Sequence, residues 1–266
     1  MNIYEDIDLT KFPQKLYSKN ILNAIIEIRF DTDIPQEILA ATVISSLYSS
    51  ENIQKKYDKP IATNFNNIPP IIRRSDPNLK NAILYSLDSK DSKFRIGCGD
   101  KFISLSNLNF AYETWNVFIA EFKTIFEILK SSNHNLLKSI TQLGIRYINV
   151  FDENIFNNLN IKLEILNENI CDNDLRFSVQ SKVKNRNIII QISNNINYKF
   201  LNVDTTPKQV KEMKGSAFDI DVILTDKNKL NIDTMFEIEE SHNVLKTVFF
   251  GTLKQAFIDE LLKDKE

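Results

Sequence analysis

The stretch that decides the fold is LGIRYINVFDENI, residues 143–155, close to the middle of the chain. It predicts a long strand that ends in an acidic turn. A similar stretch, IIEIRFDTDI, occupies residues 25–34. Each of the two is followed by a helix or helical turn, a strand-rich region and a long amphipathic helix. The sequence therefore predicts two related halves in one molecule.

The long helices of the two halves also begin alike. The sequence is ETWNV at 113–117 and ESHNV at 240–244. We predict an α+β fold in which residues 1–136 form the first half and residues 137–266 the second, within one compact unit. Each half is a strand, a helix, several antiparallel strands and a long helix. Packed in layers, these elements give a curved antiparallel sheet with the helices on one face. Because the inner strands align poorly, a fold without duplication is the alternative.

The first half opens with a strand at 24–30, whose alternation places Glu27 and Arg29 on the face opposite to Ile26 and Ile28. Residues 1–20 are expected to wrap onto the body, and the prolines within 50–80 predict an irregular region. The other expected elements of this half are a helix at 35–48, strands at 82–87, 94–98 and 102–106, and a helix at 112–130.

The second half is expected to contain a polar loop that holds Pro207 and Gly215. Its other expected elements are a strand at 140–151, a helical turn at 156–159, strands at 161–166, 175–184, 188–193, 198–203 and 218–224, and a helix at 234–262. Apolar residues recur every three or four positions in both long helices, which predicts one buried face on each.

Composition excludes several classes of protein. A net charge of −2 in 266 residues gives no general attraction to nucleic acid or to an anionic membrane. Two cysteines cannot form a disulfide framework, and two histidines provide no metal-binding pair. Five glycines supply neither a dinucleotide-binding nor a P-loop signature. We therefore expect no cofactor and no metal, and we expect neither a signal peptide nor a membrane span. A cytoplasmic location is the expectation.

Paired carboxylates at Asp219 and Asp221, with Lys227 nearby, are the strongest candidate for enzyme chemistry. Two carboxylates could bind Mg²⁺ in a nuclease. Alternating aspartates are also typical of the solvent face of a strand. The sequence leaves this choice open, and no catalytic residue is assigned.

Basic residues gather at Arg73 and Arg74 and along the strand expected at 175–184, where Arg176 and Lys182 share one face. Such a face could contact a phosphate backbone or an acidic partner. The water-facing side of an antiparallel sheet has the same composition.

Arg29 and Arg146 each lie within a strand that should be central in its half. A buried arginine needs a carboxylate partner, and Glu27 shares the face of Arg29 two residues away. Structural ion pairing is the first role predicted for these arginines, and contact with a ligand or partner is the second.

The same residues carry a family resemblance. The motifs NAIIEIRF at 23–30, YETW at 112–115 and GIRYIN at 144–149 resemble those of a sporadically distributed family of uncharacterised bacterial proteins of about this length. The resemblance spans roughly residues 20–262. It departs at 150–151, where the family would have a more polar residue, and this puts a binding role for the end of that strand in doubt.

That family has no established activity. Its sporadic distribution implies gene clusters that move horizontally, such as anti-phage defence or mobile-element systems. We predict a non-enzymatic binding or scaffold subunit of a bacterial multi-protein system. Its partner would be a protein encoded nearby or a second copy of the chain. The alternative is a nucleic-acid-binding or nucleic-acid-processing component that uses the curved sheet.

Overall fold

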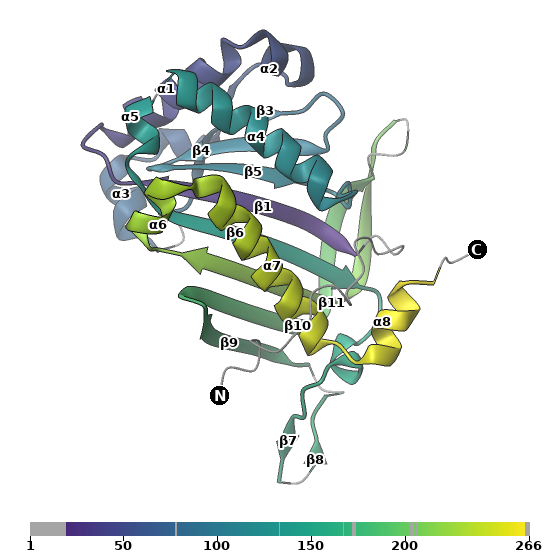
Figure 1. Ribbon diagram of the computed structural model, residues 1–266. Helices are drawn as coiled ribbons and strands as arrows, with labels where there is room; N and C mark the ends of the chain where they lie inside the picture. Colours follow the sequence, from purple (N-terminus) through teal and green to yellow (C-terminus); the bar gives the residue numbers. More distant parts are fainter. Residues whose placement is uncertain are drawn as a thin grey trace.

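The computed structural model describes residues 20–77, 79–132, 134–166, 168–171, 174–202, 205 and 207–263. At its centre is a curved sheet of nine strands, ordered β2-β3-β4-β5-β1-β6-β11-β10-β9, with every neighbouring pair antiparallel (Figure 1). The predicted mixed fold around a curved antiparallel sheet is confirmed. The strands of this sheet are Ile21–Phe30 (β1), Ile61–Ala62 (β2), Ile83–Asp88 (β3), Phe94–Gly99 (β4), Phe102–Asn107 (β5), Ile140–Phe151 (β6), Arg176–Val183 (β9), Arg186–Asn202 (β10) and Gln209–Leu224 (β11).

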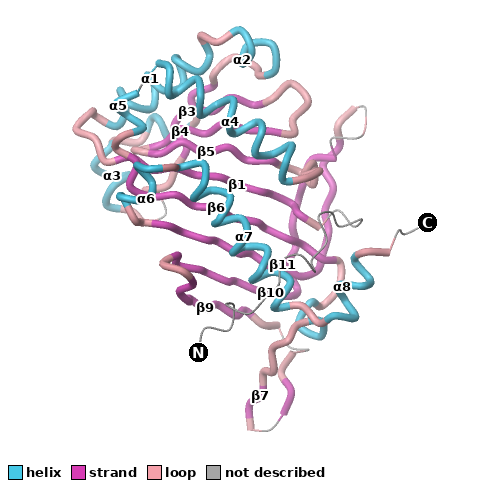
Figure 2. The backbone as a smooth tube through the Cα atoms, in the orientation of Figure 1, coloured by secondary structure: helices cyan, strands magenta, loops and turns pink. Residues whose placement is uncertain are grey.

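The longest helices lie on one face of the sheet. Figure 2 shows α4 and α7 crossing the strands on the near side, with α1 packed beside α4. We call the opposite surface of the sheet the open face. The helices are Gln36–Tyr48 (α1), Glu51–Lys56 (α2), Pro70–Ser75 (α3), Trp115–Ser132 (α4), His134–Leu137 (α5), Lys227–Ile232 (α6), Thr234–Thr252 (α7) and Gln255–Leu261 (α8), with 3-10 turns at Asn64–Asn67 (η2) and Ile155–Asn158 (η3). A separate small hairpin pairs Glu164–Ile165 (β7) with Glu168–Asn169 (β8).

The core lies between the sheet and these helices. Residues opposed in an antiparallel ladder share a face, and Ile26 of β1 lies between Leu105 of β5 and Ile145 of β6. All three are buried, as are Phe118 and Phe122 on the apolar stripe of α4. The predicted alternation in β1 and the predicted stripe on α4 are both confirmed.

Residues 50–80 contain short elements separated by prolines. Helix α3 begins directly after Pro69, with Pro70 in its first turn, where a missing N–H costs no hydrogen bond. Helix α2 ends before Pro60. The prediction that no long helix forms here is confirmed, and the first 19 residues of the chain lie outside the described residues.

The strands predicted at 188–193, 198–203 and 218–224 are confirmed within β10 and β11, but the polar loop predicted around Gly215 is wrong. β10 and β11 form one long hairpin in which Gly215 lies within β11 and pairs with Ile196. Beyond Ser193 the pairing register shifts, and Asn195 there has a φ of 56°. The distal residues 196–202 and 209–215, here called the arm, are largely polar and partly or fully exposed. The returning strand at 209–214 lacks the hydrophobic alternation that predicts strands, because its only large apolar residues, Val210 and Met213, are three positions apart.

The arm returns to the strand ends of the first half. The Leu201 N–H donates to Oδ1 of Asn109 at 3.0 Å, and Lys208 Nζ donates to the Ser92 hydroxyl at 2.6 Å. In Figure 1 the arm rises on the side of the sheet away from α4 and α7. A side chain at Gly215 would place its Cβ 1.9 Å from the carbonyl oxygen of Phe151. Glycine therefore permits the close crossing where β11 leaves β6.

The helix predicted at 234–262 is interrupted. Leu253 is extended and separates α7 from α8. Its carbonyl accepts a hydrogen bond from the Asn160 amide at 2.7 Å, and Leu253 forms a β-bridge with Leu159. These long-range contacts stabilise a break that the helical period does not reveal.

Candidate functional site

The open face carries five charged residues at the centre of the sheet, which we call the central cluster. They are Glu27 and Arg29 on β1, Arg146 on β6, and Asp219 and Asp221 on β11. β6 lies between β1 and β11, so three adjacent strands supply the cluster. Both arginines singled out in the sequence lie here.

Arg29 is held from two sides. Its Nε donates to Oε1 of Glu27 at 2.7 Å, and its Nη2 donates to Oδ1 of Asn81 at 2.9 Å. The guanidinium also lies over the ring of Phe102, 5.2 Å from its centroid. The predicted ion pair with Glu27 is therefore confirmed. Burial raises the pKa of Glu27, and the charge of Arg29 partly offsets that rise.

Arg146 forms a bidentate ion pair with Asp219. Its Nε donates to Oδ1 at 2.8 Å and its Nη2 to Oδ2 at 2.5 Å. This hydrogen bonding raises the pKa of Arg146, against the opposing effect of burial. Such bidentate geometry fixes both side chains. The carboxylate of Asp219 is therefore already occupied by a cation from this chain.

Asp221 has a different environment. Within the described part of the chain it accepts no hydrogen bond and forms no ion pair, although it is partly buried. A Cβ added at Gly144, on the neighbouring strand, would meet only Oδ1 of Asp221, at 3.8 Å. Space is thus open beside the carboxylate. The pKa of Asp221 is raised to about 6. Burial is the main cause, the charges of Asp219 and Glu27 contribute to the rise, and the two arginines of the cluster oppose it.

The residues suggested as a nuclease site do not converge. Lys227 donates to Oδ2 of Asp31 at 3.2 Å, and Asp219 is bound to Arg146. No group of three or more His, Cys, Asp or Glu side chains in the described residues is arranged to hold a metal ion.

Arg176 and Lys182 lie on β9, at the edge of the sheet, and both are exposed. The register places them opposite Ser193 and Asn187 of β10, so the neighbouring strand offers no carboxylate. Neither forms an ion pair with any described residue. With respect to the described residues these two cations are uncompensated, unlike the arginines of the central cluster.

The structure separates Arg73 from Arg74. Arg73 is 1% exposed and its Nη2 bonds Oδ1 of Asp100 at 3.2 Å, while its Nη1 donates to the Ile68 carbonyl. It thus attaches α3 to the turn between β4 and β5. Arg74 is exposed.

Sequence reasoning missed a polar and aromatic cluster on the helix side of the sheet. The Trp115 ring stacks on His242 with centroids 3.8 Å apart, and its Nε1 donates to Oε2 of Glu239 at 2.6 Å. The hydroxyls of Tyr112 and Tyr147 bond at 2.7 Å. Burial lowers the pKa of His242 to about 3, so this histidine is neutral near pH 7. The shared start of the two long helices was the available signal, because it aligns Trp115 with His242.

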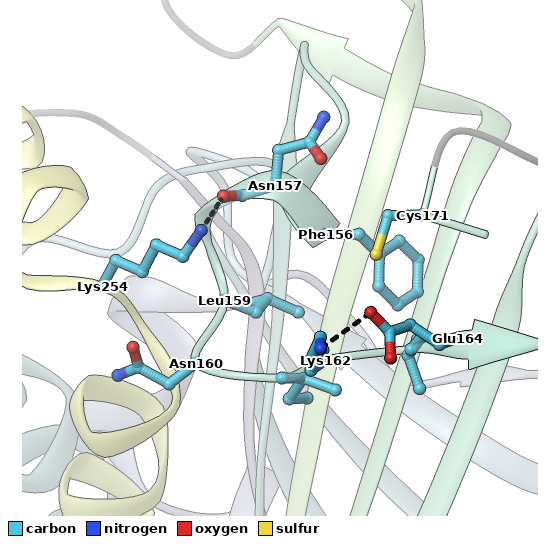
Figure 3. Close-up of a pocket in the computed structure, with 10 residues that line it drawn as sticks. Phe156, Asn157, Leu159, Asn160, Lys162, Glu164, Cys171 and Lys254 are labelled. Carbon is cyan, nitrogen blue, oxygen red and sulfur yellow. Dashed lines mark hydrogen bonds and ion pairs between the residues drawn. The ribbon is translucent and has the colours of Figure 1, made fainter. Parts of the chain in front are cut away.

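A cleft of about 380 Å³ lies between η3 and the break that separates α7 from α8 (Figure 3). Its apolar residues include Phe156, Leu159 and Cys171. Its two lysines are already bonded: Lys254 Nζ to the Asn157 carbonyl at 2.7 Å and Lys162 Nζ to Glu164 at 2.8 Å. The cleft therefore presents an apolar floor and a rim whose lysines already have partners.

Comparison with known proteins finds no family model and no curated protein that matches this sequence. The family resemblance drawn from the three motifs therefore stays a prediction. Among the described residues, none of the helices combines the length and apolar character needed to cross a membrane.

Proposed function

We propose that this protein is a non-enzymatic binding or scaffold subunit that holds a partner protein on its open face. The observation that carries the proposal is Asp221. A carboxylate that is partly removed from water and given no hydrogen bond lowers the stability of the fold. A donor group from a partner, such as a lysine or arginine side chain, would remove that cost on binding.

Exposed apolar residues favour a protein as the partner. Four large hydrophobic side chains within residues 61–72 are exposed, among them Ile71 at 76%. This segment precedes Asn81, which binds Arg29 of the central cluster. Exposed apolar side chains near a polar site are typical of protein interfaces. The four residues are Ile61, Phe65, Ile71 and Ile72.

The charge of the open face argues against the alternative, a nucleic-acid-binding component. The central cluster has three carboxylates and two arginines, and the uncompensated cations Arg176 and Lys182 lie at the sheet edge. A phosphate backbone crossing the centre would meet Asp221. We expect no gel shift with duplex or single-stranded DNA or RNA even at low salt, where phosphate contacts are strongest.

We also propose that the two halves arose by duplication. The sheet order from its centre outward is β1-β5-β4-β3-β2 on one side and β6-β11-β10-β9 on the other, so four strands of each half correspond in order and the two-residue β2 has no counterpart. Trp115 and His242, aligned by the shared helix starts, stack on each other. The corresponding strand order and the stacking of Trp115 on His242 both support an internal twofold arrangement. The setting in a defence or mobile-element system, and in the cytoplasm, rests on the family resemblance and composition alone.

Co-purification tests the proposed binding role. The chain is expressed with the product of each neighbouring gene, and the complexes are measured by size-exclusion chromatography with light scattering. We expect a stable complex that Asp221→Asn weakens at least tenfold. Glu51→Gln is the matched control, because it removes an exposed carboxylate on α2.

A strict monomer that retains none of these proteins would contradict the proposal. A complex that Asp221→Asn leaves unchanged would place the interface away from the central cluster.

A further inference from the structure

We propose that the outer edge of β9 accepts an extended acidic segment of a partner protein as an additional strand of the sheet. This inference rests on the proposed partner-binding role and adds the chemistry of the bound segment. It follows from the free edge of β9, the direction of its backbone groups and its uncompensated charges.

The edge of β9 is long and accessible. β9 has 8 residues and ends the sheet, and no described residue pairs with its outer side (Figure 1). Six of those residues are exposed, including Val179 at 38%. A strand of this length with unpaired N–H and C=O groups is a template for a further strand.

The turn between β9 and β10 determines which backbone groups are available. Lys184 and Asn185 have φ values of 45° and 64°, as in a type I′ turn, between the paired residues Val183 and Arg186. The pair that flanks such a turn is hydrogen-bonded across the hairpin. Because the direction alternates along a strand, the N–H and C=O of Gln180 and of every second residue from it point away from β10.

The side chains of β9 on the open face favour a partner segment that carries negative charge. Arg176 and Lys182 lie on the open face, six positions apart, with neutral residues opposite them on β10. Carboxylates on an added strand would lie directly across from both, where opposite charges stabilise a pair. A second copy of β9 paired antiparallel about Val179 would instead oppose Arg176 to Lys182. The charges therefore disfavour self-pairing and favour an acidic segment.

The side chains on the other face of β9 favour apolar residues at the opposing positions of the bound segment. Phe177 and Val179 point to the helix side, and Phe177 packs against the core. An antiparallel added strand would carry apolar residues opposite these two and acidic residues at the two ends. The heptapeptide ESTVTVE has this pattern, with its first residue opposite Lys182 and its last opposite Arg176.

Fluorescence anisotropy with labelled ESTVTVE and the full-length protein tests the inference. We expect saturable binding that weakens at least tenfold for the peptide KSTVTVK. A peptide with both threonine amides N-methylated should also bind at least tenfold more weakly, because those amides would bond the outward groups of β9.

Two protein variants locate the binding to the edge. Gln180→Pro removes an outward N–H but no bond to β10, so it should abolish peptide binding while circular dichroism and the unfolding midpoint stay close to wild type. Gln180→Thr is the matched control and should bind normally. The double variant Arg176→Glu and Lys182→Glu should reverse the preference and bind KSTVTVK more tightly than ESTVTVE.

Three results would overturn the inference: no peptide binding, equal binding of both peptides, or full binding by folded Gln180→Pro. If the only effect of the double variant Arg176→Ala and Lys182→Ala is self-association, the two cations act only to prevent edge-to-edge pairing between copies of the protein. The outcomes are separable from those of the proposed function. A partner complex that depends on Asp221 but survives Gln180→Pro would support that function and reject this inference.

Discussion

At the scale of single residues, the open face contains two kinds of carboxylate. Glu27 and Asp219 each bond an arginine, whereas Asp221 relies on longer-range attraction to the same two arginines. The pKa of about 6 for Asp221 lies above its ordinary value of 3.8. Between these values the folded protein binds more protons at this group than the unfolded chain does. The free energy of unfolding therefore falls as the pH rises from 3.8 to about 6. Above that range the destabilisation by the ionised Asp221 carboxylate is fully present.

Asp221→Asn should accordingly stabilise the protein. At pH 7 we expect the free energy of unfolding to rise by about 1–3 kcal/mol, since two pKa units correspond to roughly that range. Well below pH 3.8 the difference should vanish, because the wild-type carboxyl is then protonated in both states. Urea unfolding at several pH values measures this. A loss of stability at pH 7 would show that Asp221 has a structural partner.

Removal of the carboxylate from the buried pair of Arg186 and Glu237 should lower the free energy of unfolding, in contrast to Asp221→Asn. Arg186 Nη2 donates to Glu237, and its Nε donates to the Ser241 hydroxyl at 2.9 Å, with both charged side chains under 10% exposed. Glu237→Ala leaves a buried cation without its carboxylate, and we expect a loss of about 3–5 kcal/mol in denaturant unfolding. The double variant Arg186→Met and Glu237→Leu is the control and should lose much less.

At the scale of elements, the returning strand of the arm, residues 209–215, is the least expected part of the fold. The residues of the arm pair with each other, Leu201 in the arm bonds Asn109, and the adjacent Lys208 bonds Ser92, so the arm depends on contacts far away in the sequence. The crossing at Gly215 positions the whole arm, because that residue lies against the backbone of Phe151. A change at this crossing should therefore affect the arm more than the sheet.

Gly215→Ala should loosen the arm and lower stability by about 1–3 kcal/mol, as overpacking does. Hydrogen exchange should speed up at the arm amides while those of β1 remain protected. Gly144→Ala is the matched control, since its Cβ would meet only an atom at 3.8 Å. Equal protection of the arm in both variants would contradict the assigned role of Gly215.

At the scale of the whole molecule, β1 and β6 join the two halves through one continuous ladder at the centre of the sheet. The stacked Trp115 and His242 connect α4 to α7 above that ladder. Each half thus supplies the other with a neighbouring strand and a neighbouring helix. The molecule is expected to fold as one unit.

Separate expression of residues 1–136 and 137–266 tests this. Each piece would expose a long central strand edge, and we expect insoluble or self-associating material. Co-expression should recover a soluble complex with the circular dichroism of the intact chain. Two pieces that are each monomeric and cooperatively folded would show that the halves are independent domains.

The sequence by itself determined the strands and helices that bury one face. Alternation in β1 and the apolar stripe of α4 are local patterns, because a half-buried strand or helix repeats its hydrophobic residues with a fixed period. The pairing of Arg29 with Glu27 was predictable for the same reason, since residues two apart on a strand share a face. The approximate extent of β1, β6 and α4 followed from these patterns.

Only the tertiary structure decided the arm, the break at Leu253 and the central cluster. The returning strand of the arm, residues 209–215, leaves no pattern of alternation in the sequence, and the break depends on Asn160 and Leu159. Arg146 meets Asp219 across 73 positions of sequence, and Asp221 accepts no hydrogen bond from any residue that the structure describes. Strand register sets which charges pair and which do not, and register comes from packing of the whole sheet.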